Sequence, residues 1–118
     1  MSRAYLDYLH DLFSAFAPIA TRAMFGGHGV YREGVIIGIV IDEILYLKVD
    51  SLSREDFESA GSAPFMYEAK GKTMSLHYHT PPEDALESPA LMAPWARLAL
   101  DAAVAARKPA KKPKASKS

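Results

Sequence analysis

The chain has 118 residues, of which 49% are apolar, and it contains no cysteine. This length allows one domain with a modest core, and the lack of cysteine excludes disulfides, thiolate zinc sites and cysteine nucleophiles. No apolar run approaches the roughly 20 residues that a membrane helix needs, and the N-terminus lacks the layout of a signal peptide. We therefore expect a cytoplasmic protein with no membrane contact.

The formal net charge of zero hides a strong segregation of charge along the chain. Eight of the 14 basic side chains and all 14 acidic ones precede the last twelve residues, so the body has a formal charge of −6. The other six basic residues are Arg107, Lys108, Lys111, Lys112, Lys114 and Lys117. Lys, Pro, Ala and Ser dominate residues 108–118, a composition that cannot form a core. We expect a domain over residues 1–107 and a disordered basic tail over residues 108–118.

The first expected element is an amphipathic helix over residues 3–17, whose apolar side chains recur at helical spacing up to Pro18. Glycines then interrupt a strand-like run from Arg22 to Tyr31. Glycine allows close backbone approach, so this run predicts one bulged strand. A phosphate-binding loop is the alternative, but such loops open a helix, and strand residues follow here.

Two strands are expected next, joined by a turn at Asp42 and Glu43. Both alternating sets of residues 35–41 are apolar apart from Gly38, which predicts a strand covered on both faces. In residues 44–49, one alternating set of side chains is apolar and suits the core, and the other set combines apolar, aromatic and cationic side chains. The core set is Leu45, Leu47 and Val49, and the mixed set is Ile44, Tyr46 and Lys48.

A second helix is expected over residues 54–60, with a capping box from Ser53 to Asp56, a hydrophobic staple between Leu52 and Phe57, and a left-handed Gly61. Residues 65–69 and 74–79 predict a second hairpin.

Ser88 suits the N-cap of a last helix, in which Pro94 predicts a break and a main segment starting there. Leu91, Trp95, Leu98 and Ala102 are expected to line one face of this helix. The predicted order is helix, three strands, helix, two strands, helix. It indicates a two-layer α+β domain with a mainly antiparallel five-stranded sheet.

Several separated motifs carry a resemblance to a known family. They are Arg22-x-Met24-Phe25-Gly26-Gly27-x-Gly29-x-Tyr31, Leu45-Tyr46-Leu47-Lys48, Gly61-x-x-Pro64-Phe65-x-Tyr67, Tyr78-x-x-Pro81 and Trp95. In this order they resemble the N-terminal domain of the TfoX/Sxy family, which is tied to regulation of bacterial competence. The resemblance implies a secretion-chaperone-like α+β fold, with no known catalytic residue or cofactor to transfer.

The sheet suggests a partner surface. If helices cover one face, an apolar patch on the other needs an occupant, either a protein partner or a second copy in a homodimer. The expected patch consists of Ile36, Val40, Ile44, Tyr46 and Lys48. A non-enzymatic regulatory or protein-interaction domain is therefore the first functional hypothesis. Arg22 is expected to pair with a carboxylate or to cap backbone carbonyls, with anion binding as the alternative.

Two further hypotheses stay open. The six basic residues at the C-terminal end predict weak, salt-sensitive, sequence-independent contact with DNA, for which a merely solvated tail is the alternative. His77 and His79 share one strand face at a spacing that can chelate a metal, with His10, His28 or Glu68 as third ligands, although no motif places them. An enzyme is the third hypothesis, and no hydrolase signature supports it.

Overall fold

The computed structural model describes residues 3–24, 27–69 and 72–107, and it describes residues 67–69, 72–76 and 107 by their backbone alone. Its elements, in order, are α1 (Arg3–Leu12), β1 (Ala20–Met24), β2 (Gly27–Arg32), β3 (Val35–Ile41), β4 (Ile44–Lys48), α2 (Arg54–Ser59), β5 (Pro64–Ala69), β6 (Lys72–His79), the 3-10 helix η1 (Glu83–Glu87) and α3 (Pro89–Arg107). The expected α+β class is confirmed.

The sheet has six strands in the order β1-β2-β3-β4-β6-β5, and every neighbouring pair is antiparallel. The prediction of five strands is wrong, because the stretch from Arg22 to Tyr31 forms a hairpin rather than one bulged strand. Met24 lies opposite Gly27 in that hairpin. The glycines therefore accompany a reversal of the chain, which a run of apolar residues alone does not reveal.

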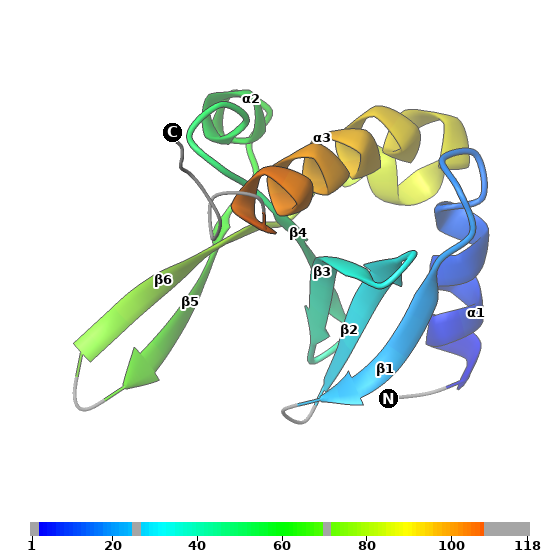
Figure 1. Ribbon diagram of the computed structural model, residues 1–118, viewed down its shortest axis with the longest axis horizontal. Coiled ribbons are helices and arrows are strands. Elements are labelled where there is room, and N and C mark those ends of the chain that lie inside the picture. The colour runs from blue at the N-terminus through cyan, green and yellow to red at the C-terminus, as the bar shows by residue number, and fades with distance from the viewer. Residues whose placement is uncertain (1–2, 25–26, 70–71, 108–118) are drawn as a thin grey trace.

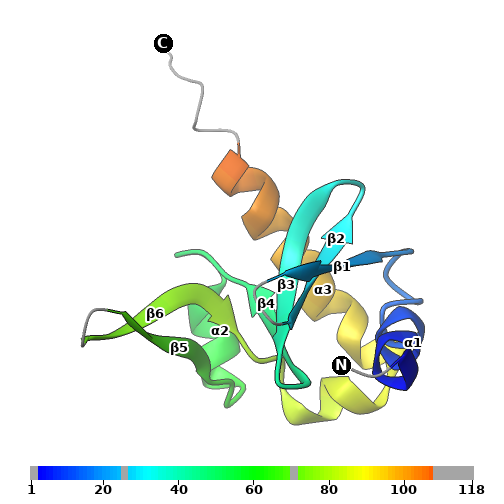
Figure 2. The same cartoon turned by 90° about the horizontal axis from the view of Figure 1, so that it is seen from below.

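The helices lie on one side of strands β1 to β4, and the β5–β6 hairpin extends away as an arm (Figures 1 and 2). Only two register pairs are described between β4 and β6, Leu47 with His79 and Lys48 with Tyr78. The arm is therefore joined to the rest of the sheet over a short junction.

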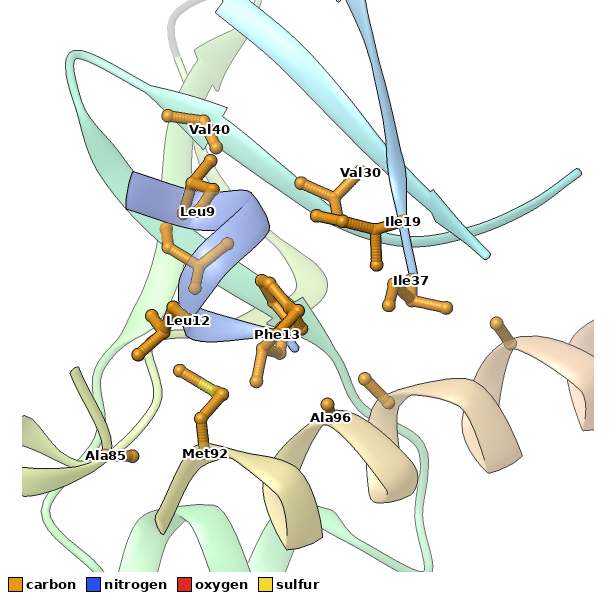
Figure 3. Close-up of a cluster of buried hydrophobic side chains, with 14 of the residues drawn as sticks. Leu9, Leu12, Phe13, Ile19, Val30, Ile37, Val40, Ala85, Met92 and Ala96 are labelled. Carbon is orange, nitrogen blue, oxygen red and sulfur yellow. The ribbon is translucent and has the colours of Figure 1, made fainter. Parts of the chain in front are cut away.

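The core fills the space between the helices and one face of the sheet. Leu12 and Phe13 point from the N-terminal helical segment toward Met92 and Ala96 of α3, and Leu9 lies beside Val40 (Figure 3). The strands contribute fully buried side chains to the same cluster. They are Val30, Ile37, Val40, Leu45, Leu47 and Val49. The predicted core set of β4 is thus confirmed.

A β-bulge in β3 changes which of its side chains reach the core. Val30 lies opposite Gly38, but the next residue, Tyr31, lies opposite Ile36, so Ile37 has no direct partner on β2. Such an extra residue reverses the alternation of faces beyond it. Ile37 and Val40 are consequently both 0% exposed in the core. Val40 was expected on the partner surface, and that prediction is wrong.

The start of α2 differs from the predicted capping box. Ser53 makes no side-chain cap of the helix. The Asp50 Oδ1 instead stabilises the turn before α2, because it accepts hydrogen bonds from the backbone N–H groups of Leu52 and Ser53, each at 3.0 Å. Leu52 is 87% exposed, so the predicted staple with buried Phe57 is wrong. Gly61 has φ +86°, which confirms the left-handed residue after this helix.

The other two helices differ from their predicted bounds. The segment expected at residues 3–17 is helical only to Leu12 and continues in turns. The final helix runs through Pro94 without a break. Pro94 and Ala90 are both exposed, so water can replace the backbone hydrogen bond that proline removes. The buried stripe of α3 is Met92, Ala96, Ala99, Ala102 and Ala103. Of the predicted face, Ala102 is buried and Trp95 and Leu98 pack against the core, whereas Leu91 is 49% exposed.

Candidate functional site

The face of the sheet that points away from the helices is the candidate site, and we call it the outer face. Residues directly opposite each other on neighbouring strands share a face, so Arg22, Gly29, Ile39 and Tyr46 form one row across β1 to β4. By the same register and alternation, the outer face comprises Ala20, Arg22, Met24, Gly27, Gly29, Tyr31, Ile36, Ile39, Ile41, Ile44, Tyr46, Lys48 and Tyr78.

Two motif glycines permit the packing of this face. A Cβ atom on Gly29 would lie 2.7 Å from the sulfur of Met24 and 2.9 Å from a ring carbon of Tyr31, so these side chains lie over the glycine. A Cβ atom on Gly27 would lie 2.0 Å from the carbonyl oxygen of Val40. This distance is too short for any side chain, so only glycine fits at this position. Both glycines therefore have a structural role in strands that approach closely.

Two cations on the outer face lie over tyrosine rings. The guanidinium carbon of Arg22 is 5.6 Å from the ring centroid of Tyr31, and the ammonium nitrogen of Lys48 is 5.1 Å from that of Tyr78. These distances are within the range of cation–π attraction. We call these four residues the tyrosine–cation cluster.

The two tyrosines of the cluster also interact with each other. Burial raises the pKa of Tyr78 above its ordinary value of 10.0, and an electrostatic interaction with Tyr31 acts in the same direction. Two side chains from β2 and β6, which are not neighbours in the sheet, are thus brought within electrostatic range. At neutral pH the Tyr78 phenol keeps its proton and can donate a hydrogen bond.

Apolar side chains form the rest of the outer face. Ile39 is only 7% exposed, whereas Ile44 is 46% exposed at the end of β4. The ring of Tyr46 contacts that of Phe65 edge to face, with 4.9 Å between their centroids, and this contact reaches from β4 to the arm. Of the predicted partner surface, Ile36, Ile44, Tyr46 and Lys48 share this face, and Ile39 takes the place expected for Val40.

The described structure places His77 and His79 on the side of α2. The His77 Nδ1 lies 3.3 Å from the Arg54 guanidinium, and His79 is buried beside the ring of Phe57 with its Nδ1 3.5 Å from the Ser62 hydroxyl. Burial lowers the pKa of His79, with Arg54 acting in the same direction and Glu58 opposing it. Each imidazole therefore has a neighbour that is not a metal ligand.

The third ligands named for a metal site are not gathered around these two histidines. His10 is exposed on α1, His28 lies on β2, and the side chain of Glu68 is outside the described residues. Within the described part of the chain, no group of three or more His, Asp or Glu side chains is arranged to hold a metal ion.

The Ser62 hydroxyl next to His79 is already used in the fold. It donates a hydrogen bond of 2.8 Å to the Phe57 carbonyl, which belongs to the end of α2. A pocket of about 320 Å³ lies nearby, between the start of α2 and the last turns of α3, with Arg54 and His77 at its wall. Lys48, Asp50 and Ser51 also line it, and three alanines of α3 form its apolar side.

Two sets of predicted site residues are not placed by the structure. Phe25 and Gly26 of the motif, and the tail from Lys108 to Lys117, lie outside the described residues. Arg107 is the last residue of α3 and is described by its backbone alone. The prediction of DNA contact through the tail therefore stays a prediction.

Sequence reasoning missed the tyrosines of the cluster as functional candidates. Tyr31 and Tyr78 were recognised only as members of separate motifs, at positions 47 residues apart in the sequence. The motifs themselves contained the signal, because Arg22, Tyr31, Lys48 and Tyr78 belong to three of them and meet on one face. No alternation pattern within a single strand reveals that meeting.

Comparison with known proteins agrees with these motifs. None of the described helices is long and apolar enough to span a membrane. A search of curated proteins finds no match. The family model described as the TfoX N-terminal domain matches residues 11–103, which includes all six strands, α2 and most of α3. The chain thus belongs to the TfoX N-terminal domain family.

Proposed function

We propose that this chain is a non-enzymatic regulatory domain that acts by binding protein through its outer face. Membership of the TfoX N-terminal domain family supports a domain of the kind found in competence regulators. The observation that carries the proposal is the composition of the outer face. Half-buried Ile36 and Tyr46 and the exposed Ile44 share this face with two cations. At its margins, Ile36 and Lys48 line a hollow with Ala103 of α3, and Ile44 lines one with Tyr5 and Tyr8 of α1.

The chemistry of this face is that of a protein interface. Aromatic residues and arginine are enriched in the buried centres of interfaces, and they contribute most of the binding energy there. Each square ångström of apolar surface removed from water contributes about 25 cal/mol, so covering isoleucine and tyrosine side chains is favourable. The polar groups that the outer face offers are two cations and tyrosine hydroxyls, and they can fix the orientation of a partner.

The size of the native assembly tests this proposal. The wild-type chain, gently extracted from its own host and sized by gel filtration, should elute well above the 12.9 kDa of a monomer. Ile44→Asp introduces a charge into the outer face and should return the chain to monomer size. Leu52→Asp is the matched control, because Leu52 is more exposed than Ile44 but lies before α2, away from the outer face.

The alternatives predict other elution profiles. A wild-type chain that elutes as a monomer at all concentrations contradicts the proposal. An assembly that survives Ile44→Asp but is lost with Leu52→Asp places the contact elsewhere. Purified chain that assembles by itself identifies the occupant as a second copy.

A further inference from the structure

We propose that the partner presents an acidic and apolar protein segment, whose carboxylates bind the tyrosine–cation cluster. This inference rests on the proposed function and gives the partner a chemical class. The two ends of the tyrosine–cation cluster are Arg22 over Tyr31 and Lys48 over Tyr78.

Charge complementarity carries the first step. The body of the chain is acidic, with a formal charge of −6, yet no Asp or Glu is among the outer-face residues. The ion pairs found within the described part of the chain are Arg32–Glu33 and Arg97–Asp101, so Arg22 and Lys48 have no carboxylate partner there. The outer face is therefore a basic patch on an acidic molecule, and it favours an acidic ligand over a basic one.

The positions of the two cations over tyrosine rings are the second argument for an acidic ligand. A cation held over a ring retains N–H groups that can donate to an incoming carboxylate, and the arginine fork can donate two such bonds. Because the rings already restrict both long side chains, less conformational entropy is lost when a ligand binds. The protonated Tyr78 hydroxyl adds a neutral donor next to Lys48.

The width of the face between the two strands that carry the cations sets the size of the ligand. The backbones of Arg22 on β1 and Lys48 on β4 are three strand spacings apart in the sheet, or roughly 14 Å across the strands. Ile36, Ile39 and Tyr46 lie on the same face in and between these strands. A single small carboxylate cannot cover this apolar floor, so the ligand is a segment of several residues that carries both acidic and apolar side chains.

Two other occupants fit the face less well. A second copy that docks by the same face brings the same two cations and no carboxylate from it, so like charges would oppose each other. A single-stranded nucleic acid needs flat rings on which bases stack. Tyr46 instead packs edge to face with Phe65, and four isoleucines occupy much of the outer face.

Peptide selection gives a direct test. A random twelve-residue peptide library is selected on the full chain and, in parallel, on the double variant Arg22→Glu/Lys48→Glu. The wild type should enrich peptides in which Asp or Glu flanks aliphatic or aromatic residues, and the variant should enrich Lys or Arg at those places. The best acidic peptide, measured by fluorescence anisotropy, should lose at least about tenfold in affinity for the double variant. Arg97→Glu, a charge reversal on exposed α3, should leave its affinity unchanged.

Each other result overturns the inference and shows whether the proposed function falls with it. If the selected peptides lack acidic residues but bind the Ile44→Lys variant more weakly than the wild type, the inference is contradicted and the proposed outer-face interface is still supported. If the selected peptides bind the double variant and the Ile44→Lys variant as tightly as the wild type, the inference and the proposed function are both contradicted. The same conclusion follows if no peptide is selected and the native chain is a monomer. Binding of an oligo-dT strand that is lost in the double variant assigns the face to nucleic acid, and a dimer lost in that variant assigns it to a second copy. Circular dichroism confirms that each variant is folded.

Discussion

Lys48 lies over the ring of Tyr78, and these two residues also form one of the two described register pairs that join β4 to β6. The same contact therefore helps to fix the arm and to position a cation on the outer face. Tyr78→Leu should loosen the arm, because it removes both the ring and its attraction for Lys48. Amide hydrogen exchange in β5 and β6 should become faster, while Tyr78→Phe, which keeps the ring, should change it little. Unchanged exchange in Tyr78→Leu contradicts this role.

The glycines of the β1–β2 hairpin should differ in their sensitivity to substitution. Gly27→Ala places a Cβ atom against the backbone oxygen of Val40, which can move only with the strand, and should cost about 3 kcal/mol or more of unfolding free energy. In Gly29→Ala the close atoms belong to side chains of Met24, Tyr31 and Ile36, which can rotate away, so the cost should be about 1 kcal/mol. Urea unfolding measures both, and equal costs contradict the explanation.

The bulge in β3 predicts that truncating Val40 and truncating Ile44 cost different amounts of unfolding free energy. Val40 is fully buried, so Val40→Ala should cost about 2 kcal/mol in urea unfolding. Ile44 is 46% exposed, so Ile44→Ala should cost only about 0.5 kcal/mol. If Ile44 proves the more costly, the register of β3 and β4 is wrong.

Tyr5 predicts the response of the fold to alkali. Burial raises the pKa of Tyr5 from 10.0 to about 12, with smaller contributions from Tyr8 and Glu43. The folded state therefore binds the proton more tightly than the unfolded state does. This stabilising contribution is fully present below pH 10 and is lost as the pH rises through about 12. In an ultraviolet titration, the Tyr5→Phe variant should lack the tyrosinate transition that the wild type shows near pH 12, and a Tyr5 that ionises at pH 10 contradicts the burial.

The sequence predicted those elements whose pattern is local. Leu45, Leu47 and Val49 alternate along β4 and the residue that follows it, and the structure buries all three. The left-handed Gly61 was predicted for the same reason, because its conformation depends on its own lack of a side chain.

The predictions that failed concern features that depend on the register of a neighbouring strand. Val40 belongs to the core because Ile37 is an extra residue opposite β2, and no property of residues 35–41 alone indicates where an extra residue falls. The hairpin at the glycines was likewise hidden, because Met24 and Gly27 read as two parts of one strand until their pairing is known. The tyrosine–cation cluster depends on three strand pairings together, so single-strand patterns could not reveal it.

A photo-crosslinking measurement tests the central claim most directly. Benzoylphenylalanine is incorporated in the native host at Ile44 on the outer face or at Leu52 before α2, and the cells are irradiated. The outer-face interaction predicts a discrete protein adduct at position 44 that is absent at position 52. Adducts of equal yield at both positions, or at position 52 alone, would contradict it.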